Sequence, residues 1–152
     1  MVRVMRLALS LAVLAALLVG TVSSTLAGGP KVLDATMVGI PTANLALHGI
    51  PGGGVPWVID EGRAKLFADG RLQVEVDGLV LATTHTNPVP TGRAIVTCSS
   101  VAVAQSGAVP FSPTGDAVVD TTVNLPATCL APAVFFAGIT GAGDRWFAVT
   151  GS

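Results

Sequence analysis

The chain has 152 residues, of which 51% are hydrophobic and 11% are charged, and its formal net charge is −1. About a quarter of the hydrophobic residues lie in residues 1–27, and the remainder is about 46% hydrophobic, which is ordinary for a soluble domain. Gly and Pro make up about 22% of that remainder and supply many turns. This composition excludes a coiled coil, a disordered charged tail and a multidomain enzyme.

Residues 1–27 have the pattern of a secretory signal peptide. Arg3 and Arg6 precede a mostly apolar run over residues 7–19, and small residues close the segment. The run is shorter than the roughly 20 residues of a membrane-spanning helix. We therefore predict a cleaved signal rather than an uncleaved anchor. The mature chain, residues 28–152, is expected to be secreted or held in the cell envelope without a stable membrane span.

Charge argues against a nucleic-acid partner. Two of the eight Lys and Arg residues, Arg3 and Arg6, lie in the signal, so six remain against nine Asp and Glu and give a net charge of about −3. Binding to a phosphate backbone needs clustered Lys and Arg, which this chain lacks. The partner is left open, and an extracellular or envelope partner is the expectation.

The sequence offers little for catalysis or cofactor binding. His48 and His85 are the only histidines, and neither has a close-spaced second ligand for a metal ion. No Gly-x-Ser-x-Gly nucleophile elbow occurs. We expect no cofactor, no metal and no enzyme activity.

Cys98 and Cys129 are the only cysteines, and both lie in the part predicted to be exported. In an oxidising compartment two such residues pair, so we predict a disulfide bond between them. It would close a loop of about 32 residues, which corresponds to about 3.5–4 kcal/mol in the chain-entropy model. A reactive thiol is the alternative and needs a neighbouring base.

Period-two patterns predict short strands after residue 30. Residues 117–125 alternate between an apolar and a polar face, and Pro126 follows them. Further candidate strands are residues 32–38, 43–47, 55–59, 93–103, 133–140 and 145–150. About eight short strands separated by turns predict an all-β fold, a single antiparallel β-sandwich or barrel over residues 28–152.

Residues 62–81 read as a hairpin around Asp69 and Gly70. A two-residue loop would mix charged and apolar side chains on one face. A three-residue loop with Gly70 in a left-handed conformation instead pairs Leu66 with Leu72 and sets charged residues opposite polar ones, so we predict this register. Phe67 then falls on the polar face, and the sequence does not explain it.

The segment Pro51-Gly52-Gly53-Gly54-Val55-Pro56-Trp57 is the most distinctive in the chain. Its glycines permit unusual backbone angles or a close approach by another segment. One interpretation is a loop that presents Trp57, Asp60 and Glu61 to a ligand, with His85 from a polar loop. The other is a tight crossover in which Trp57 closes the end of the core. On the last strand, we expect one of Trp146 and Phe147 to face inward and the other outward, with core packing as their role.

Several stretches together resemble a group of small secreted bacterial proteins with no assigned activity. The residues that carry the resemblance are GIPGGGVPWVI at 49–59, GLV at 78–80, NPVP at 87–90, RAIVTC at 93–98 and WFAVTG at 146–151. The resemblance covers most of the mature chain, implies export and a β fold, and transfers no catalytic residue.

Three functions are compatible with the sequence. The first is a non-catalytic exported domain that binds a partner or belongs to the envelope. The second is a small-molecule carrier, a barrel with Trp57 near the rim of an apolar interior cavity. The third is a small hydrolase that uses Asp60, Glu61 and His85, which requires those groups to converge. The first is our prediction.

Overall fold

The computed structural model describes residues 29–151, so the predicted signal peptide (1–27) lies outside the described residues. Regular structure in residues 29–151 consists of β-strands, which confirms the all-β prediction. The strands are β1 (Lys31–Gly39), β2 (Trp57–Val58), β3 (Glu61–Phe67), β4 (Arg71–Asp77), β5 (Val80–Leu81), β6 (Thr91–Cys98), β7 (Val101–Gln105), β8 (Val109–Pro110), β9 (Ala117–Thr122), β10 (Ala133–Thr140) and β11 (Gly143–Thr150).

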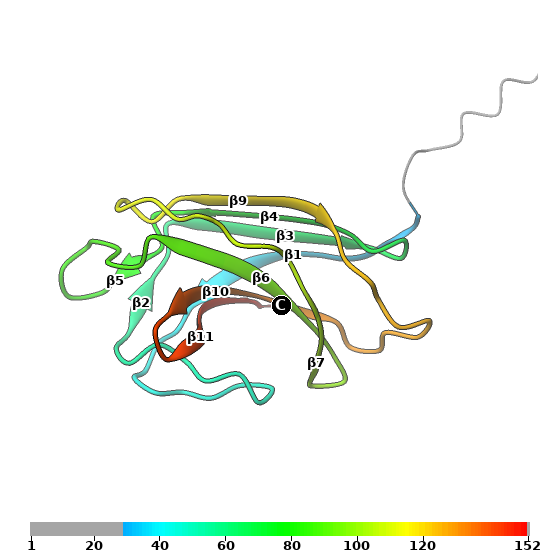
Figure 1. Ribbon diagram of the computed structural model, residues 1–152, viewed down its shortest axis with the longest axis horizontal. Helices are drawn as coiled ribbons and strands as arrows, with labels where there is room; N and C mark the ends of the chain where they lie inside the picture. The colour runs from blue at the N-terminus through cyan, green and yellow to red at the C-terminus, as the bar shows by residue number, and fades with distance from the viewer. Residues whose placement is uncertain (1–28, 152) are drawn as a thin grey trace, which may run out of the picture.

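Eight of these strands form one antiparallel sheet in the order β7-β6-β10-β11-β1-β3-β4-β9, and β8 pairs with β6. The sheet curls into a half-barrel, so that β3, β4 and β9 lie over β10 and β11 (Figure 1). β2 and β5 form a separate two-stranded sheet. No helix in residues 29–151 is long and apolar enough to cross a membrane.

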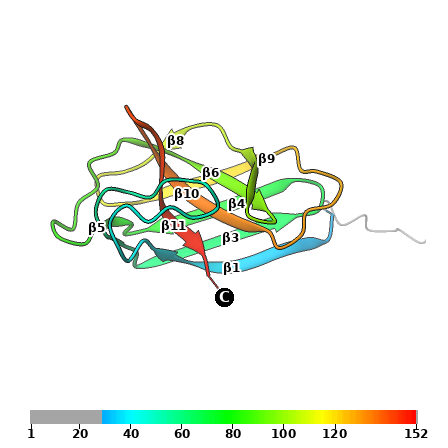
Figure 2. The ribbon, with the colours of Figure 1, turned by 90° about the horizontal axis from the view of Figure 1, so that it is seen from below.

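β1 joins the two halves of the curled sheet. Its first part pairs with β3 as far as Thr36, opposite Arg63. From Met37 onward it pairs with β11 instead, and Figure 2 shows β11 meeting β1. A strand that changes partners along its length turns a corner between two layers. The curl of the sheet therefore depends on this one strand.

The β3–β4 hairpin has the predicted register, with Leu66 opposite Leu72. Gly70 has a φ of 88°, as a left-handed position in a three-residue loop requires. The structure also explains Phe67. Its ring lies 4.0 Å from the guanidinium carbon of Arg71, so the aromatic side chain on the polar face is covered by a cation.

The predicted strand over residues 93–103 is wrong, because two strands occupy it. The chain reverses at Ser99 and Ser100, whose φ angles are 50° and 66°. Two successive left-handed residues make the tight turn that joins β6 to β7. The turn was missed because it contains neither Gly nor Asn, the residues that normally mark such a turn.

The predicted strand over residues 43–47 is also wrong. This segment is a loop that ends in a tight turn at His48 and Gly49, with φ angles of 51° and 77°. Leu47 and Ile50 exchange two backbone hydrogen bonds across the turn. The strand predicted over residues 55–59 shrinks to the two residues of β2, and β8 was not predicted.

The strands predicted over residues 32–38, 117–125, 133–140 and 145–150 are confirmed to within three residues at each end. The hairpin predicted over residues 62–81 ends at Asp77, and residues 80–81 instead form β5, which pairs with β2. The alternation over residues 117–125 is confirmed, with Val119 and Val123 buried and Val118 and Asp120 exposed.

The sheet half that contains β10 and β11 is covered on both faces. Trp146 is 1% exposed and Phe147 is 2% exposed, so both pack in the core from opposite faces of β11, as expected, and neither face is left to solvent. Trp146 packs edge-on against Phe135 and donates its indole N–H to the carbonyl of Leu45. Phe147 packs on the inner side against Trp57. The loop that contains Leu45 supplies the cover that the strand pattern did not reveal.

The predicted disulfide bond between Cys98 and Cys129 is confirmed, with a Cα–Cα distance of 5.0 Å. It joins the end of β6 to the segment between β9 and β10. A backbone hydrogen bond from Ser99 to the carbonyl of Leu130 lies beside it. The disulfide therefore fixes an irregular connection against the β6–β7 turn.

Candidate functional site

A groove opens where β1 leaves β3. Because Thr36 is the last β1 residue that pairs with β3, Glu61 and Gly62 have a strand partner on the β4 side only. β1 diverges from them toward β11, and β2 lies beside the gap. The groove is lined by apolar groups of Val38, Gly39, Pro41, Trp57, Val58 and Ile59, and by the acids Asp60 and Glu61.

Three of the four sequence-predicted site residues line this groove. Trp57 lies in β2, Asp60 follows β2, and Glu61 begins β3, so their closeness in the chain brings them together. His85 is not among the lining residues. It sits in an exposed turn with a φ of 52°, where its N–H donates to the carbonyl of Leu81.

Trp57 is 4% exposed and forms part of the core at the base of the groove. Its ring stacks on Phe147 at a centroid distance of 3.8 Å with an interplanar angle of 12°. Its backbone N–H donates to the carbonyl of Ile40. The indole therefore closes the end of the core, as the crossover interpretation of this segment proposed.

Glycines allow the backbones around Trp57 to approach closely. A Cβ at Gly53 would lie 2.8 Å from the Trp57 indole nitrogen and 3.1 Å from the Phe147 ring. A Cβ at Gly39 would lie about 2.4 Å from the Trp57 carbonyl oxygen. Gly54, in contrast, faces open space. Gly39 and Gly53 are therefore positions where no side chain would fit.

The acidic end of the groove lacks cationic partners. Among residues 29–151, no ion pair involves Asp60 or Glu61. Glu61 stands directly opposite Asp77 on β4, an arrangement of like charges that disfavours the sheet. Arg63, which lines a hollow together with Glu61 and Asp77, binds the carboxylate of Asp34 at 2.8 Å. The two acids are exposed and open to a positively charged group.

Asp116 organises the turn before β9, at the same end of β4. Its carboxylate accepts hydrogen bonds from the hydroxyls of Thr114 and Ser112 and from the backbone N–H of Gly78. These donors, the Thr114 hydroxyl first, lower the pKa of Asp116 below its ordinary value. Asp116 is therefore a structural carboxylate.

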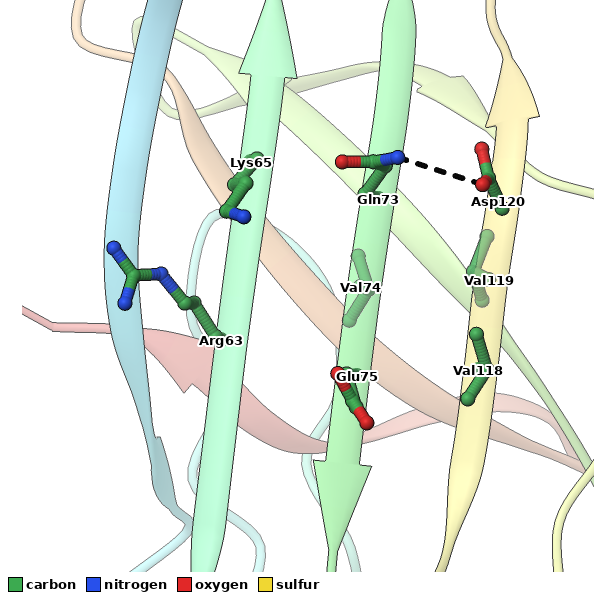
Figure 3. Close-up of a pocket in the computed structure, with 8 residues that line it drawn as sticks. All are labelled: Arg63, Lys65, Gln73, Val74, Glu75, Val118, Val119 and Asp120. Atoms are coloured by element: carbon green, nitrogen blue, oxygen red, sulfur yellow. Dashed lines mark hydrogen bonds between the residues drawn. The ribbon is translucent and has the colours of Figure 1, made fainter.

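A second depression lies on the outer face of β3, β4 and β9 (Figure 3). Figure 3 shows Lys65, Gln73 and Asp120 side by side across the three strands, with Gln73 donating to Asp120 at 3.4 Å. The depression is lined by charged and polar side chains together with three valines, and it contains no histidine, cysteine or serine. We regard it as a solvated sheet face.

No group of three or more His, Cys, Asp or Glu side chains within residues 29–151 is arranged to hold a metal ion. His48 has a structural role, because its Nδ1 and the Thr97 hydroxyl share a hydrogen bond of 2.8 Å and its ring packs edge-on against Phe135. Ser106 is buried and hydrogen-bonds to the backbone at Ala94 and Gly107. These polar side chains hold the fold together.

The wall of the groove that β1 provides could not be seen in the sequence. Val38 and Pro41 are 19 and 16 residues from Trp57 in the chain, and only the folded sheet brings them beside it. One feature of the sequence did indicate this wall. Gly39 ends an otherwise regular strand pattern, and a glycine there indicates close approach of another backbone.

Comparison of the chain with protein-family models, with curated proteins and with solved structures finds no match. The resemblance to small secreted bacterial proteins therefore stays a prediction, and the groove is interpreted from its own chemistry.

Proposed function

We propose that this protein is an exported, non-catalytic binding domain that takes an extended peptide segment of a partner protein into the groove between β1 and β2–β3. The segment carries an apolar side chain next to Lys or Arg. The observation that carries this proposal is the pairing of apolar walls with Asp60 and Glu61 at one end of the groove.

The apolar walls favour a ligand that carries an apolar side chain over a purely polar ligand. Val38 is 52% exposed and Val58 is 41% exposed, so each has apolar surface to bury against a partner. Both are groove residues. An apolar side chain between them would remove that surface from water.

The acids favour a basic neighbour in the same ligand. Asp60 and Glu61 are exposed, and Arg63 is engaged with Asp34. A Lys or Arg side chain would also relieve the repulsion between Glu61 and Asp77 across the hairpin. Complementary charge chiefly adds specificity and speeds association.

The backbone favours an extended ligand. Glu61 and Gly62 pair with β4 but have no strand partner on the side that faces the groove. An extended peptide can add hydrogen bonds to such an unpaired edge, the mode known as β-augmentation. This is the feature that distinguishes a peptide from a compact small molecule.

Export is supported by two independent features. The N-terminal pattern of Arg residues, an apolar run and small residues is typical of a signal peptide. The Cys98–Cys129 bond fits an oxidising compartment outside the cytoplasm. The expected partner is therefore extracellular or part of the envelope.

The carrier and hydrolase hypotheses have less support. The carrier hypothesis needs an apolar interior cavity beside Trp57, but Phe147 and Phe111 stack there on Trp57. The hydrolase hypothesis needs His85 beside the acids, and His85 does not line the groove.

Peptide titration tests the proposed function. A synthetic peptide of alternating Val and Lys should bind, and its Val/Glu counterpart should not. The Asp60→Asn and Glu61→Gln double variant should weaken binding about tenfold, whereas Asp120→Asn, which changes an exposed acid on β9, should leave it unchanged. Equal binding of the two peptides, or binding insensitive to the double variant, would contradict the proposal.

Mass spectrometry of the protein recovered from the medium or envelope of producing cells tests export. We expect a chain that begins at Gly28. A chain that retains residues 1–27 would contradict signal cleavage.

A further inference from the structure

We propose that the groove between β1 and β2–β3 takes the free N-terminal end of the partner protein, with the α-ammonium group of that end beside Asp60 and Glu61. This inference rests on the proposed function and states which part of the partner enters the groove. A partner exported through a cleaved signal peptide would carry such a free end.

The groove is closed at both of its ends. At one end β1 pairs with β3, beginning with Thr36 opposite Arg63. At the other end the backbone N–H of Trp57 donates to the carbonyl of Ile40 at 3.0 Å, which ties β2 to the residue after β1. A peptide that enters between these contacts must end inside the gap or turn back toward solvent. A chain end fits this gap without a turn.

The groove has room for a few residues only. Its volume is about 510 Å³, within the range of roughly 300–1,000 Å³ that is usual for small-ligand sites. The open part of the β3 edge is equally short, because Glu61 and Gly62 are the β3 residues without a partner on β1. An opening of this length suits the first residues of a chain better than an internal segment, which needs space on both sides.

The charge of the lining favours an N-terminus over a C-terminus. Asp60 and Glu61 belong to the lining, and no Lys, Arg or His does among the described residues. Arg63, at one closed end, has its guanidinium bound to the carboxylate of Asp34. A C-terminal carboxylate would therefore meet two like charges, whereas an α-ammonium group meets two opposite charges.

The apolar walls take the side chains that follow the α-ammonium group. Val38 and Val58 are both partly exposed, so a chain whose first side chains are apolar buries surface on both. The N-terminal part of this chain is already bound elsewhere, because the N–H of Gly29 donates to Asp69 in the turn at the far end of β3. We therefore assign the groove to the end of a different protein.

Calorimetric titration of the mature, disulfide-bonded protein with two forms of the peptide Val-Lys-Val-Lys-Val tests this inference. One form has a free N-terminus and the other is acetylated there, and both are amidated at the C-terminus. We expect acetylation to weaken binding about tenfold or more, because it removes the terminal charge and leaves every side chain in place.

A variant locates the contact. Glu61→Gln should weaken binding of the free peptide about tenfold and change binding of the acetylated peptide much less, because the group that faces Glu61 is then already uncharged. Glu75→Gln is the matched control, since Glu75 is an exposed glutamate on β4 that does not line the groove. It should leave binding of both peptides unchanged.

The outcomes separate this inference from the proposed function. Equal binding of the free and acetylated peptides overturns the inference and leaves the proposed function standing. If neither peptide binds, both fail. Equal weakening of the two peptides by Glu61→Gln also overturns the inference, because the acids would then recognise the Lys side chains. Valine amide that binds as tightly as the free peptide would overturn it as well, by assigning the groove to a small amine.

Discussion

The Nδ1 of His48 and the hydroxyl of Thr97 lie 2.8 Å apart and join a loop to the face of the central sheet. Thr97 is fully buried on β6, and His48 occupies a tight turn. The hydrogen bond therefore holds the loop over the outer face of β6 and β10, and Trp146 and Phe135 stay covered beneath it.

Replacing His48 with Ala should lower the free energy of unfolding by about 1–2 kcal/mol, because the buried Thr97 hydroxyl loses its short hydrogen bond. His85→Ala is the matched control, since both histidines have left-handed φ angles, 51° and 52°, and His85 is exposed. Chemical denaturation monitored by tryptophan fluorescence measures both. Equal effects of the two variants would show that the hydrogen bond contributes nothing.

Replacing both Cys98 and Cys129 with Ser should destabilise the protein by about 3–4 kcal/mol, the value for opening a loop of this length. Thermal denaturation of the variant measures the loss. The parent protein under reducing conditions should unfold at the same temperature as the variant. A variant as stable as the oxidised parent would show that the disulfide is energetically neutral.

Replacing Gly53 with Ala should destabilise the protein by about 1–3 kcal/mol, because the new methyl group would press on Trp57 and the Phe147 ring. Gly54→Ala, one residue along in open space, should have no effect or a slight stabilising effect. Denaturant midpoints of the two variants decide the question. If Gly54→Ala is the more harmful, the glycines serve backbone freedom rather than close packing.

Stability should fall in acid below the ordinary range of carboxyl pKa values. Hydrogen bonds from Lys31 and Arg63 lower the pKa of Asp34, and those from Thr114 and Gly78 lower that of Asp116. Since the pKa is lower in the folded state, the stabilisation is present above the unfolded pKa and is lost as pH falls through the folded pKa.

Asp116→Asn isolates one part of this effect. We expect it to reduce stability at neutral pH by less than about 1 kcal/mol, because the carboxylate is screened by solvent. The difference between parent and variant should vanish in strong acid. Urea titrations at a series of pH values measure it, and a difference that persists at the lowest pH would assign the effect to packing.

The sequence by itself determined the features that depend on neighbouring residues. Alternation and a left-handed Gly70 are local properties, so the register that pairs Leu66 with Leu72 could be worked out before the structure was known. The same holds for the two faces of residues 117–125. The Cys98–Cys129 bond followed because the chain contains no other cysteine.

Only the tertiary structure decided which surfaces are covered and where the groove lies. Ser99 and Ser100 form a turn that their residue types do not predict. Residues 43–47 have a strand-like pattern but form a loop that covers a sheet face instead. The groove exists because β1 changes partners after Thr36. These outcomes depend on contacts between segments that are distant in the chain, and a local pattern carries no information about the partner that buries it.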